Sequence, residues 1–382
     1  MPTGGKLLVL VTRYLALLLL GLTVTLAPAA ARAAAVEDEL VIQTPMSAFV
    51  VDSMLKEFVQ FAKEKLGVTL KTRVFRAGTP VSYEAIRKWA GQPEADVFWG
   101  GEPALFNDLA GQKLLTKLEV ATDVWDAIPA SIGSPQPIPL KDAARFWVGT
   151  ALEAYGLVYS PRILKRLGVP EIHEWDDVLN PKLKGQIAQC TPTRSSSSHA
   201  TYQVILQTKG DAEGWLWLKR LAGQTGAFVS SSRDVPSVVA RAEFAVGFGV
   251  PSYFAFEDKL AGFDIRFVAP KNAFVTPEPY ATLAGARHPR AAAQFLSFLL
   301  SQRGQYLLMG RGLFSVSPKY KVHGPPGSTA ELSVQLTGGV RSFFDPPVSN
   351  IYDATLARSR YQDVNDTFRT QIEAVWDDLK KR

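Results

Sequence analysis

A run of hydroxyl-bearing residues beside an arginine is the part of this sequence best suited to bind an anion. It reads Cys190-Thr191-Pro192-Thr193-Arg194-Ser195-Ser196-Ser197-Ser198-His199 and lies between a strand-like segment, 186–190, and a helix-like segment, 200–208. The first N–H groups of a helix lack intrahelical partners and carry partial positive charge. Together with the serine hydroxyls and the Arg194 guanidinium, they suit a phosphate or carboxylate. The alternative is that one serine only caps the helix.

Other turns between strand-like and helix-like segments carry similar groups. In an open α/β sheet, ligands bind just beyond the carboxyl ends of the strands, so we expect these turns to face one cleft. Glycines in such turns let the backbone come close to a bound ligand. The predicted ligand-binding residues are Ser47, Arg76, Gly78, Thr79, Trp99, Gly100, Gly101, Tyr155, Arg194, Ser195, Ser196, Ser197, Ser198, Ser231, Arg233 and Tyr253.

The N-terminus has the pattern of a cleaved secretory signal peptide. Lys6 and Arg13 precede an apolar run over 14–26, and small residues follow through Ala35. We therefore expect residues 1–35 to be removed and the mature protein to reside in the periplasm. An uncleaved membrane anchor is the alternative, because the apolar run approaches the length of a span.

The charge and cysteine content of the rest of the chain narrow its function class. Three of the 42 basic residues lie in the predicted signal peptide, which leaves 39 against 36 acidic residues in the mature protein. This balance is too mild to indicate nucleic-acid binding. Cys190 is the single cysteine of the sequence and can form no internal disulfide. The length is sufficient for two domains with cores of their own, and we expect a monomer.

Short β-rich segments alternate with amphipathic helical segments, which is typical of sheets covered by helices. Helices are predicted over 47–66 and 81–90, and a second series of elements begins after the proline-rich stretch 132–140. The sequence thus predicts an α/β protein in which two units enclose a cleft. The strand-like segments are 39–44, 68–75, 95–99, 146–160, 186–190 and 244–253.

The resemblance of this chain to a known family rests on five segments taken together: 95–101 (ADVFWGG), 153–161, 175–179, 192–199 and 285–289. Together they resemble the substrate-binding proteins of ABC importers. The resemblance is to the type II periplasmic group that includes ferric-iron, sugar-phosphate and phosphoglycerate binders. It implies a two-lobed α/β fold, each lobe a mixed sheet flanked by helices, joined by hinge strands that close around a solute. It also implies delivery of the solute to an inner-membrane ABC permease.

The resemblance also implies an order of domains along the chain. Its hinge crossings would fall near 150–158 and 266–270. The tail resembles the longer tails of phosphoglycerate-type members, and its apolar stripe of Phe368, Ile372, Val375, Trp376 and Leu379 predicts one helix over 355–381 that packs on a lobe. The expected divisions are 1–35 signal peptide, 36–150 first part of lobe 1, 151–268 lobe 2, 269–320 return to lobe 1, and 321–382 C-terminal extension.

The sequence leaves three classes of solute open. An anionic, phosphorylated molecule is favoured by the arginines and serines of the predicted turns. An apolar or lipid-like solute is the alternative suggested by Trp99, Tyr155, Tyr253 and neighbouring phenylalanines. Ferric binders of the group offer adjacent tyrosines, whereas this chain has Tyr253-Phe254, which argues against iron. The four histidines lack metal-ligand spacing, so we expect no metal site and no cofactor.

Two further classes of function are weighed against transport. A secreted hydrolase would show a Gly-x-Ser-x-Gly elbow, a His-Glu-x-x-His helix or a P-loop, and the sequence contains none of these. We therefore expect no catalytic residues. A partner of a membrane sensor kinase uses the same fold as an importer's receptor, and the sequence does not separate the two.

Overall fold

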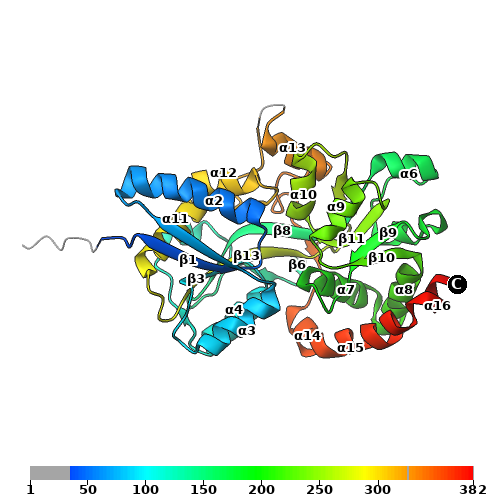
Figure 1. Ribbon diagram of the computed structural model, residues 1–382, viewed down its shortest axis with the longest axis horizontal. Coiled ribbons are helices and arrows are strands. Elements are labelled where there is room, and N and C mark those ends of the chain that lie inside the picture. The colour runs from blue at the N-terminus through cyan, green and yellow to red at the C-terminus, as the bar shows by residue number, and fades with distance from the viewer. Residues whose placement is uncertain (1–34, 325–326, 382) are drawn as a thin grey trace, which may run out of the picture. The chain divides into compact units, whose positions relative to one another are not determined.

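The computed structural model describes residues 35–324 and 327–381, and its central feature is one long strand that belongs to both halves of a ten-stranded sheet (Figure 1). This strand, β8 (Val148–Tyr159), is buried along its whole length. The described residues from Val36 onward belong to one compact unit. The predicted signal peptide lies outside the described residues. Within the described part, no helix is long and apolar enough to span a bilayer.

Lobe 1 is built on β-strands in the order β2-β1-β3-β13-β8, in which β1 pairs in parallel with β2 and β3. Alternate side chains of a strand point to opposite faces: Leu40 and Ile42 enter one core cluster, and Val41 enters another on the other face. Helices α2, α11 and α12 cover one face and α3 and α4 the other (Figure 1). The bounds are β1 Glu39–Thr44, β2 Lys71–Arg76, β3 Val97–Trp99, β13 Val275–Leu283, α2 Ala48–Phe61, α3 Thr79–Trp89, α4 Pro103–Gly111, α11 Pro289–Leu300 and α12 Gln302–Met309.

Lobe 2 continues the sheet in the order β10-β9-β11-β8, and β12 pairs with the other edge of β8. Phe248 of β11 lies at its centre, where it packs edge-on against Trp175 and Tyr202. The strand predicted over 244–253 ends earlier, because α10 begins at Ser252 and takes Tyr253 into its first turn. The bounds are β9 Ile187–Cys190, β10 Thr225–Val229, β11 Val246–Pro251, β12 Arg266–Val268, α6 Pro161–Leu167, α7 Ser196–Lys209, α8 Asp211–Gln224, α9 Asp234–Ala240 and α10 Ser252–Leu260.

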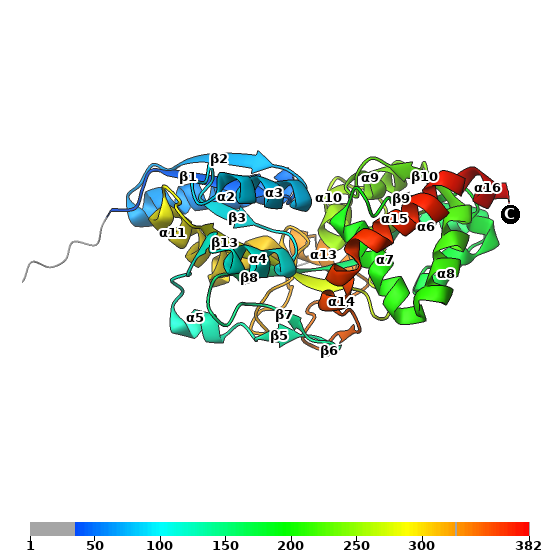
Figure 2. The same cartoon turned by 90° about the horizontal axis from the view of Figure 1, so that it is seen from below.

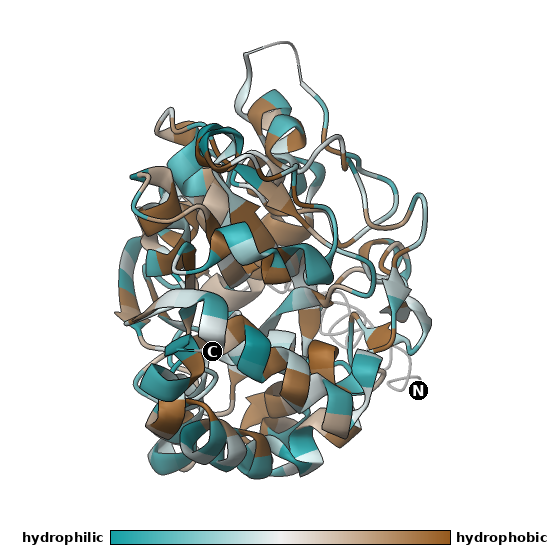
Figure 3. Cartoon of the chain, turned by 90° about the vertical axis from the view of Figure 1, so that its right-hand side faces the viewer, coloured by the Kyte–Doolittle hydropathy of each residue, from teal (hydrophilic) through white to brown (hydrophobic). Residues whose placement is uncertain are grey.

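The two lobes are connected through β8 and through the segment between β12 and β13. Residues 148–154 of β8 pair with β13 of lobe 1. Residues 155–159 pair with β11 and β12 of lobe 2. In Figure 3 the strands of the interior are mainly brown, whereas the outer helices alternate between teal and brown, as expected for helices with one buried face.

The C-terminal extension is broken into several helices, so the prediction of one helix over 355–381 is wrong. Two backbone positions interrupt it: Arg360 at φ −111°, ψ 17°, and Ile372 at φ −125°, ψ −63°. Val375 of the predicted apolar stripe is 39% exposed, whereas Phe368 and Ile372 are fully buried. The last helices run along α7 and α8 (Figure 2). The elements are α13 Thr329–Leu336, β14 Ser349–Asn350, α14 Ala354–Ser359, α15 Tyr361–Gln371 and α16 Trp376–Lys381.

Candidate functional site: a pocket between the lobes

A pocket of about 750 Å³ opens between helices of both lobes and the C-terminal extension. From lobe 1 it is lined by the starts of α3 and α4 and by the proline-rich loop 136–139. From lobe 2 it is lined by the start of α7, and from the extension by residues of α14 and its flanks. The lining residues used below are Thr79, Pro80, Glu102, Pro103, Ala104, Pro137, Ile138, Ser196, His199, Phe274, Tyr352, Arg358 and Tyr361.

Three helices of eight or more residues direct their first turns at this pocket. Helix α3 begins at Thr79 after Gly78, α4 begins at Pro103 after Glu102, and α7 begins at Ser196 after Ser195. The first N–H groups of a helix lack backbone partners, although Pro80 and Pro103 carry no N–H and the N–H of Ser198 already donates to Oγ of Ser195. Each helix dipole adds partial positive charge at that end. The rim of the pocket therefore offers hydrogen-bond donors to a negatively charged group.

Glycines allow the turn between β3 and α4 to approach its neighbours. Gly100 and Gly101 have φ of 94° and 115°, a region that side-chain-bearing residues rarely adopt. A Cβ atom on Gly101 would lie 2.8 Å from Cγ2 of Thr79, and one on Gly100 would lie 2.5 Å from Cγ of Met46. These two glycines thus set the distance between the starts of α3 and α4.

Carboxyl groups lie at the rim and behind it: Glu102 at the rim is half-buried, and Glu153 and Glu278 behind it are buried. Burial raises the pKa of Glu102, which lines the pocket, to about 7. Behind it, Glu278 of β13 accepts a hydrogen bond from the N–H of Gly101 at 3.2 Å, and burial raises its pKa to about 7. Burial and the adjacent Glu278 raise the pKa of Glu153 of β8 well above its ordinary value. Near neutral pH this group of carboxyls, which we call the acidic floor (Glu102, Glu153 and Glu278), holds protons that exposed carboxyls would have lost. Of the three, only Glu102 lines the pocket, and the other two lie behind it.

Two predicted tyrosines belong to this floor. Tyr155 and Tyr253 are 5% and 4% exposed. Burial is the main cause that raises the pKa of both hydroxyls, and the carboxyls of Glu153 and Glu278 add to it. Oε2 of Glu153 has no hydrogen-bond partner among the described residues. The floor therefore combines neutral hydroxyls with carboxyls that are at least partly protonated.

Of the predicted binding residues, Thr79 and Ser196 line the pocket, and several others shape its edge. Ser195 caps α7 by accepting from the N–H of Ser198 at 3.2 Å, and its Oγ lies 2.9 Å from Oγ of Ser197. Ser197 and Ser198 are buried in the first turn of α7. Gly78 precedes α3 as its N-cap.

The remaining predicted residues are placed away from the lining. Arg76 pairs with Asp52, and Arg233 lies 3.0 Å from Glu257 and 3.3 Å from Asp258, so both guanidinium groups already face carboxylates. Trp99 has no exposed surface, and its indole N–H donates to Oγ1 of Thr150 at 2.9 Å.

Three more of these predicted residues do not line the pocket. Ser47 caps α2, and Ser231 donates to Asp234 at 3.0 Å. Arg194 is exposed in the turn before α7 and is not among the residues lining the pocket.

Pocket residues from the C-terminal extension were missed by the sequence analysis. Tyr361 stacks on His199 with ring centroids 4.0 Å apart, and Nδ1 of His199 lies 3.2 Å from Oδ1 of Asn365. Burial lowers the pKa of His199 to about 4, so this histidine is neutral at physiological pH. The sequence signal available was Asp353, which caps α14 and so marks the start of a helix. Tyr352, Arg358 and Tyr361 lie near it in the sequence.

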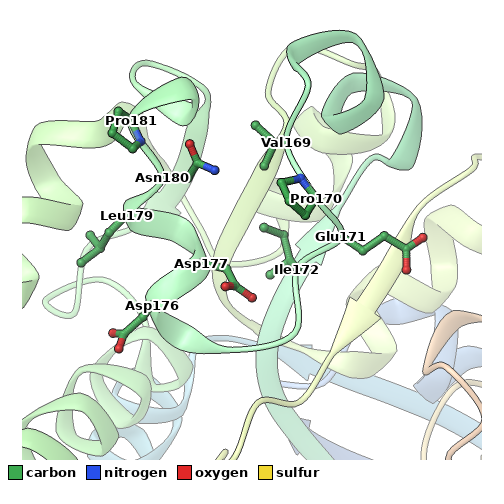
Figure 4. A pocket seen from close by; sticks show the side chains of 9 residues that line it. All are labelled: Val169, Pro170, Glu171, Ile172, Asp176, Asp177, Leu179, Asn180 and Pro181. Atoms are coloured by element: carbon green, nitrogen blue, oxygen red, sulfur yellow. The ribbon is translucent and has the colours of Figure 1, made fainter.

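A second hollow lies on lobe 2 around Val169–Pro181 (Figure 4). Its carboxylates are engaged in holding the local structure: Asp176 accepts from Lys209 and Trp217, and Asp177 accepts from two backbone N–H groups. Among the described residues, no group of three or more His, Cys, Asp or Glu side chains is arranged to hold a metal ion.

The sequence profile of the bacterial extracellular solute-binding protein family matches residues 41–313. The chain belongs to this family. The assignment confirms the predicted resemblance and agrees with the expectation of a binding protein that is not an enzyme. The extension beyond residue 313 lies outside the matched segment of this solute-binding protein.

Two curated relatives share about a quarter of their residues with this solute-binding protein. The phosphoglycerate transport regulatory protein PgtC of Salmonella typhimurium is 25% identical over 242 residues, which are 63% of this chain. The matched part spans 58% of PgtC. An uncharacterised protein of Haemophilus influenzae is 25% identical over 246 residues, which are 64% of this chain and 69% of that protein.

Solved structures of periplasmic binding proteins share the fold. AfuA of Actinobacillus pleuropneumoniae, described with fructose-6-phosphate bound, superposes with a TM-score of 0.69 at 21% identity and covers 88% of this chain and 99% of its own. Iron-bound HitA of Pseudomonas aeruginosa superposes with a TM-score of 0.63 at 20% identity and covers 86% of this chain and 99% of its own. These likenesses confirm the predicted two-lobed type II α/β fold.

Proposed function

We propose that this solute-binding protein is the periplasmic receptor of an ABC importer and that it captures a small organic anion, phosphorylated, in the pocket between its lobes. The observation that carries the proposal is the convergence of the first turns of α3, α4 and α7 on one cavity. Backbone donors of three helices can bind the oxygens of one phosphate without any paired cation.

The walls of the pocket favour an anion with a sizeable organic part. Pro80, Pro103, Pro137, Ile138 and Tyr361 present apolar surface beside the donors. A bare phosphate would leave this surface in contact with water, whereas a carbon skeleton would cover it. A solute with a charged end and an apolar end would therefore agree with both the anionic and the apolar interpretation of the sequence. The names of PgtC and the AfuA structure, which mention phosphoglycerate and fructose-6-phosphate, support this class.

Ferric iron is the competing solute because HitA is described as iron-bound. A ferric site requires several oxygen ligands that converge on one point. Tyr253 of this chain is buried beside Phe254, whose ring centroid lies 4.6 Å away, and no second tyrosine is adjacent to it in sequence. We therefore rank iron below an organic anion and keep it as an arm of the test.

Isothermal titration and thermal unfolding of the purified full chain test this function. The probes are 3-phosphoglycerate, fructose-6-phosphate, inorganic phosphate and ferric citrate. We expect the two organic phosphates to raise the unfolding temperature more than inorganic phosphate does, because binding to the folded state stabilises it. Stabilisation by ferric citrate alone would replace the anion proposal with iron.

Delivery of the solute to a permease, the monomeric state and removal of the signal peptide are part of the proposal, and each has its own measurement. Uptake of the bound solute into vesicles that contain a candidate ABC permease would support a transport role, whereas a ligand-dependent response of a membrane kinase would support a sensor. Light scattering of the mature chain tests whether it is a monomer. N-terminal sequencing of the exported protein tests whether the signal peptide is cleaved between Ala34 and Val36.

A further inference from the structure

The middle of the C-terminal extension makes a third connection between the lobes. We call residues 349–371 the strap. Its first residues pair with the loop of lobe 1, where β14 lies parallel to β6 (Ser134–Pro135) and Nδ2 of Asn350 donates to the carbonyl of Gln136 at 2.6 Å. The chain then passes to lobe 2, where α14 and α15 run along α7 (Figure 2).

A stripe of polar side chains on α7 holds the strap to lobe 2. His199, Gln203 and Gln207 are spaced four residues apart and so lie on one face of the helix. Gln203 donates to the carbonyl of Ala357 at 3.3 Å. Gln207 both donates to the carbonyl of Asp353, at 3.2 Å, and accepts from its N–H, at 2.6 Å.

Aromatic packing fixes the far end of the strap to the same lobe. Phe368 is fully buried and meets Tyr202 and Phe228 edge-on, with ring centroids 5.4 Å and 5.7 Å apart. The guanidinium of Arg360 donates to Gln203 at 2.7 Å and pairs with Asp211 at 2.6 Å. The helices of the strap are therefore part of lobe 2 in packing terms.

One side chain of α14 reaches across to lobe 1. Arg358 lines the pocket, and its Nη2 lies 2.8 Å from Oδ1 of Asp108 while its Nη1 donates to the carbonyl of Ala104 at 3.2 Å. Both partners belong to α4, whose first turn is at the pocket rim. Arg358 thus holds the strap against the anion-binding side of lobe 1.

A column of three aromatic rings joins the three connections. Tyr155 lies on β8, Phe274 lies between β12 and β13, and Tyr352 lies in the strap. The centroid of Phe274 is 5.4 Å from that of Tyr155 and 4.1 Å from that of Tyr352. Phe274 and Tyr352 also line the pocket, as Tyr361 does.

We propose that the strap is a third wall of the solute pocket, in which Tyr361 and Tyr352 contact the organic part of the anion and Arg358 closes this wall against lobe 1. The wall selects solutes that carry a planar or apolar body next to their charge, because such a body covers the two rings. This inference rests on the proposed function for the charge of the solute and on the strap's own contacts for its shape.

Fluorescence titration with 1-anilinonaphthalene-8-sulfonate, an organic anion with an aromatic body, tests the wall on the full chain. We expect one molecule to bind, Tyr361→Ala to weaken binding about tenfold, and Arg358→Ala to weaken it about threefold. Tyr361→Phe keeps the ring and should bind as the natural protein does. Leu356→Ala is the matched control, because Leu356 lies on α14, is 43% exposed and does not line the pocket.

The outcomes separate this inference from the proposed function. Equal binding by Tyr361→Ala, Arg358→Ala and Leu356→Ala would overturn the third wall, and so would absence of dye binding to the natural protein. Circular dichroism melting of each variant shows whether it is folded, and Arg358→Ala tests the wall even where Tyr361→Ala unfolds. Dye binding that depends on the strap but is displaced by neither organic phosphate would retain the wall and overturn the phosphorylated anion.

Discussion

The helix starts at the pocket rim and the acidic floor, which lies mainly behind the pocket, have opposite chemistry. The rim is formed by backbone N–H groups at the starts of α3, α4 and α7, and these groups stay positive in character at every pH. The acidic floor of Glu102, Glu153 and Glu278 has pKa values raised by burial, so its charge depends on pH. The comparison teaches that an anion of the kind proposed above would bind best while these carboxyls hold their protons.

The largest effect is expected on stability, when one carboxyl of the acidic floor is replaced by a neutral amide. A carboxyl whose pKa is raised on folding binds its proton more tightly in the folded state, so stability falls as pH rises from the ordinary value of 4.5 to about 7. We expect Glu278→Gln to remove part of this loss and to stabilise the protein at pH 8 by on the order of 3 kcal/mol. Denaturant unfolding at pH 5 and pH 8 measures it. Parallel pH curves for the natural protein and the variant would contradict a raised pKa.

A charge reversal at the rim tests the other side of the comparison. Ser196→Asp places a carboxylate at the start of α7, where it suits the helix but repels an anion. We expect 3-phosphoglycerate to bind roughly a hundredfold more weakly, as measured by calorimetry. The control is Thr193→Asp, which puts the same charge at an exposed position that does not line the pocket. Equal losses in both variants would point to long-range repulsion alone.

The pH dependence of binding links rim and floor. Ionised Glu102 opposes an anion next to it, and its pKa is raised to about 7. Affinity for 3-phosphoglycerate should therefore fall about tenfold more between pH 6 and pH 8 in the natural protein than in Glu102→Gln. Taking the difference between the two proteins removes the titration of the phosphate itself. A variant with the same pH profile as the natural protein would exclude Glu102 from the site.

The smallest expected effect tests whether Arg194 contacts the solute or acts on it only from a distance. Arg194 is exposed outside the lining, so Arg194→Ala should weaken anion binding only about threefold and mainly by slowing association. Stopped-flow measurements at low and high salt would show the effect disappear as salt rises. A tenfold loss that persists in high salt would place this guanidinium in contact with the solute.

The sequence located the turns at the rim, because local residue types mark them, but it placed two helix starts too late: the helices predicted from 81 and 200 begin at Thr79 and Ser196. Ser195 caps α7, and the two glycines after β3 form a tight turn, as their residue types suggest. The acidic floor could not be found in this way, because Glu153 and Glu278 are far apart in sequence and meet only through the pairing of β8 with β13. Trp99 was placed in the cleft on account of its glycine neighbours, but strand alternation turns its ring into the core.

The strap shows a different limit of prediction. A helical apolar stripe over 355–381 predicted a single packed helix, and the side chains of Phe368 and Ile372 are buried as this stripe requires. The break at Arg360 depends on Gln203 and Asp211 of lobe 2, which are over a hundred residues away in sequence. Tertiary contacts of this kind leave no periodic trace in the extension itself.

The third connection bears on how the two halves of the molecule can move. Two linking segments that lie side by side permit both bending and twisting between the bodies they join. A third tether, offset from the other two and pressed against them by Tyr352, opposes the twist. The remaining freedom is rotation about one axis, so opening would widen the mouth of the cavity without sliding one face past the other.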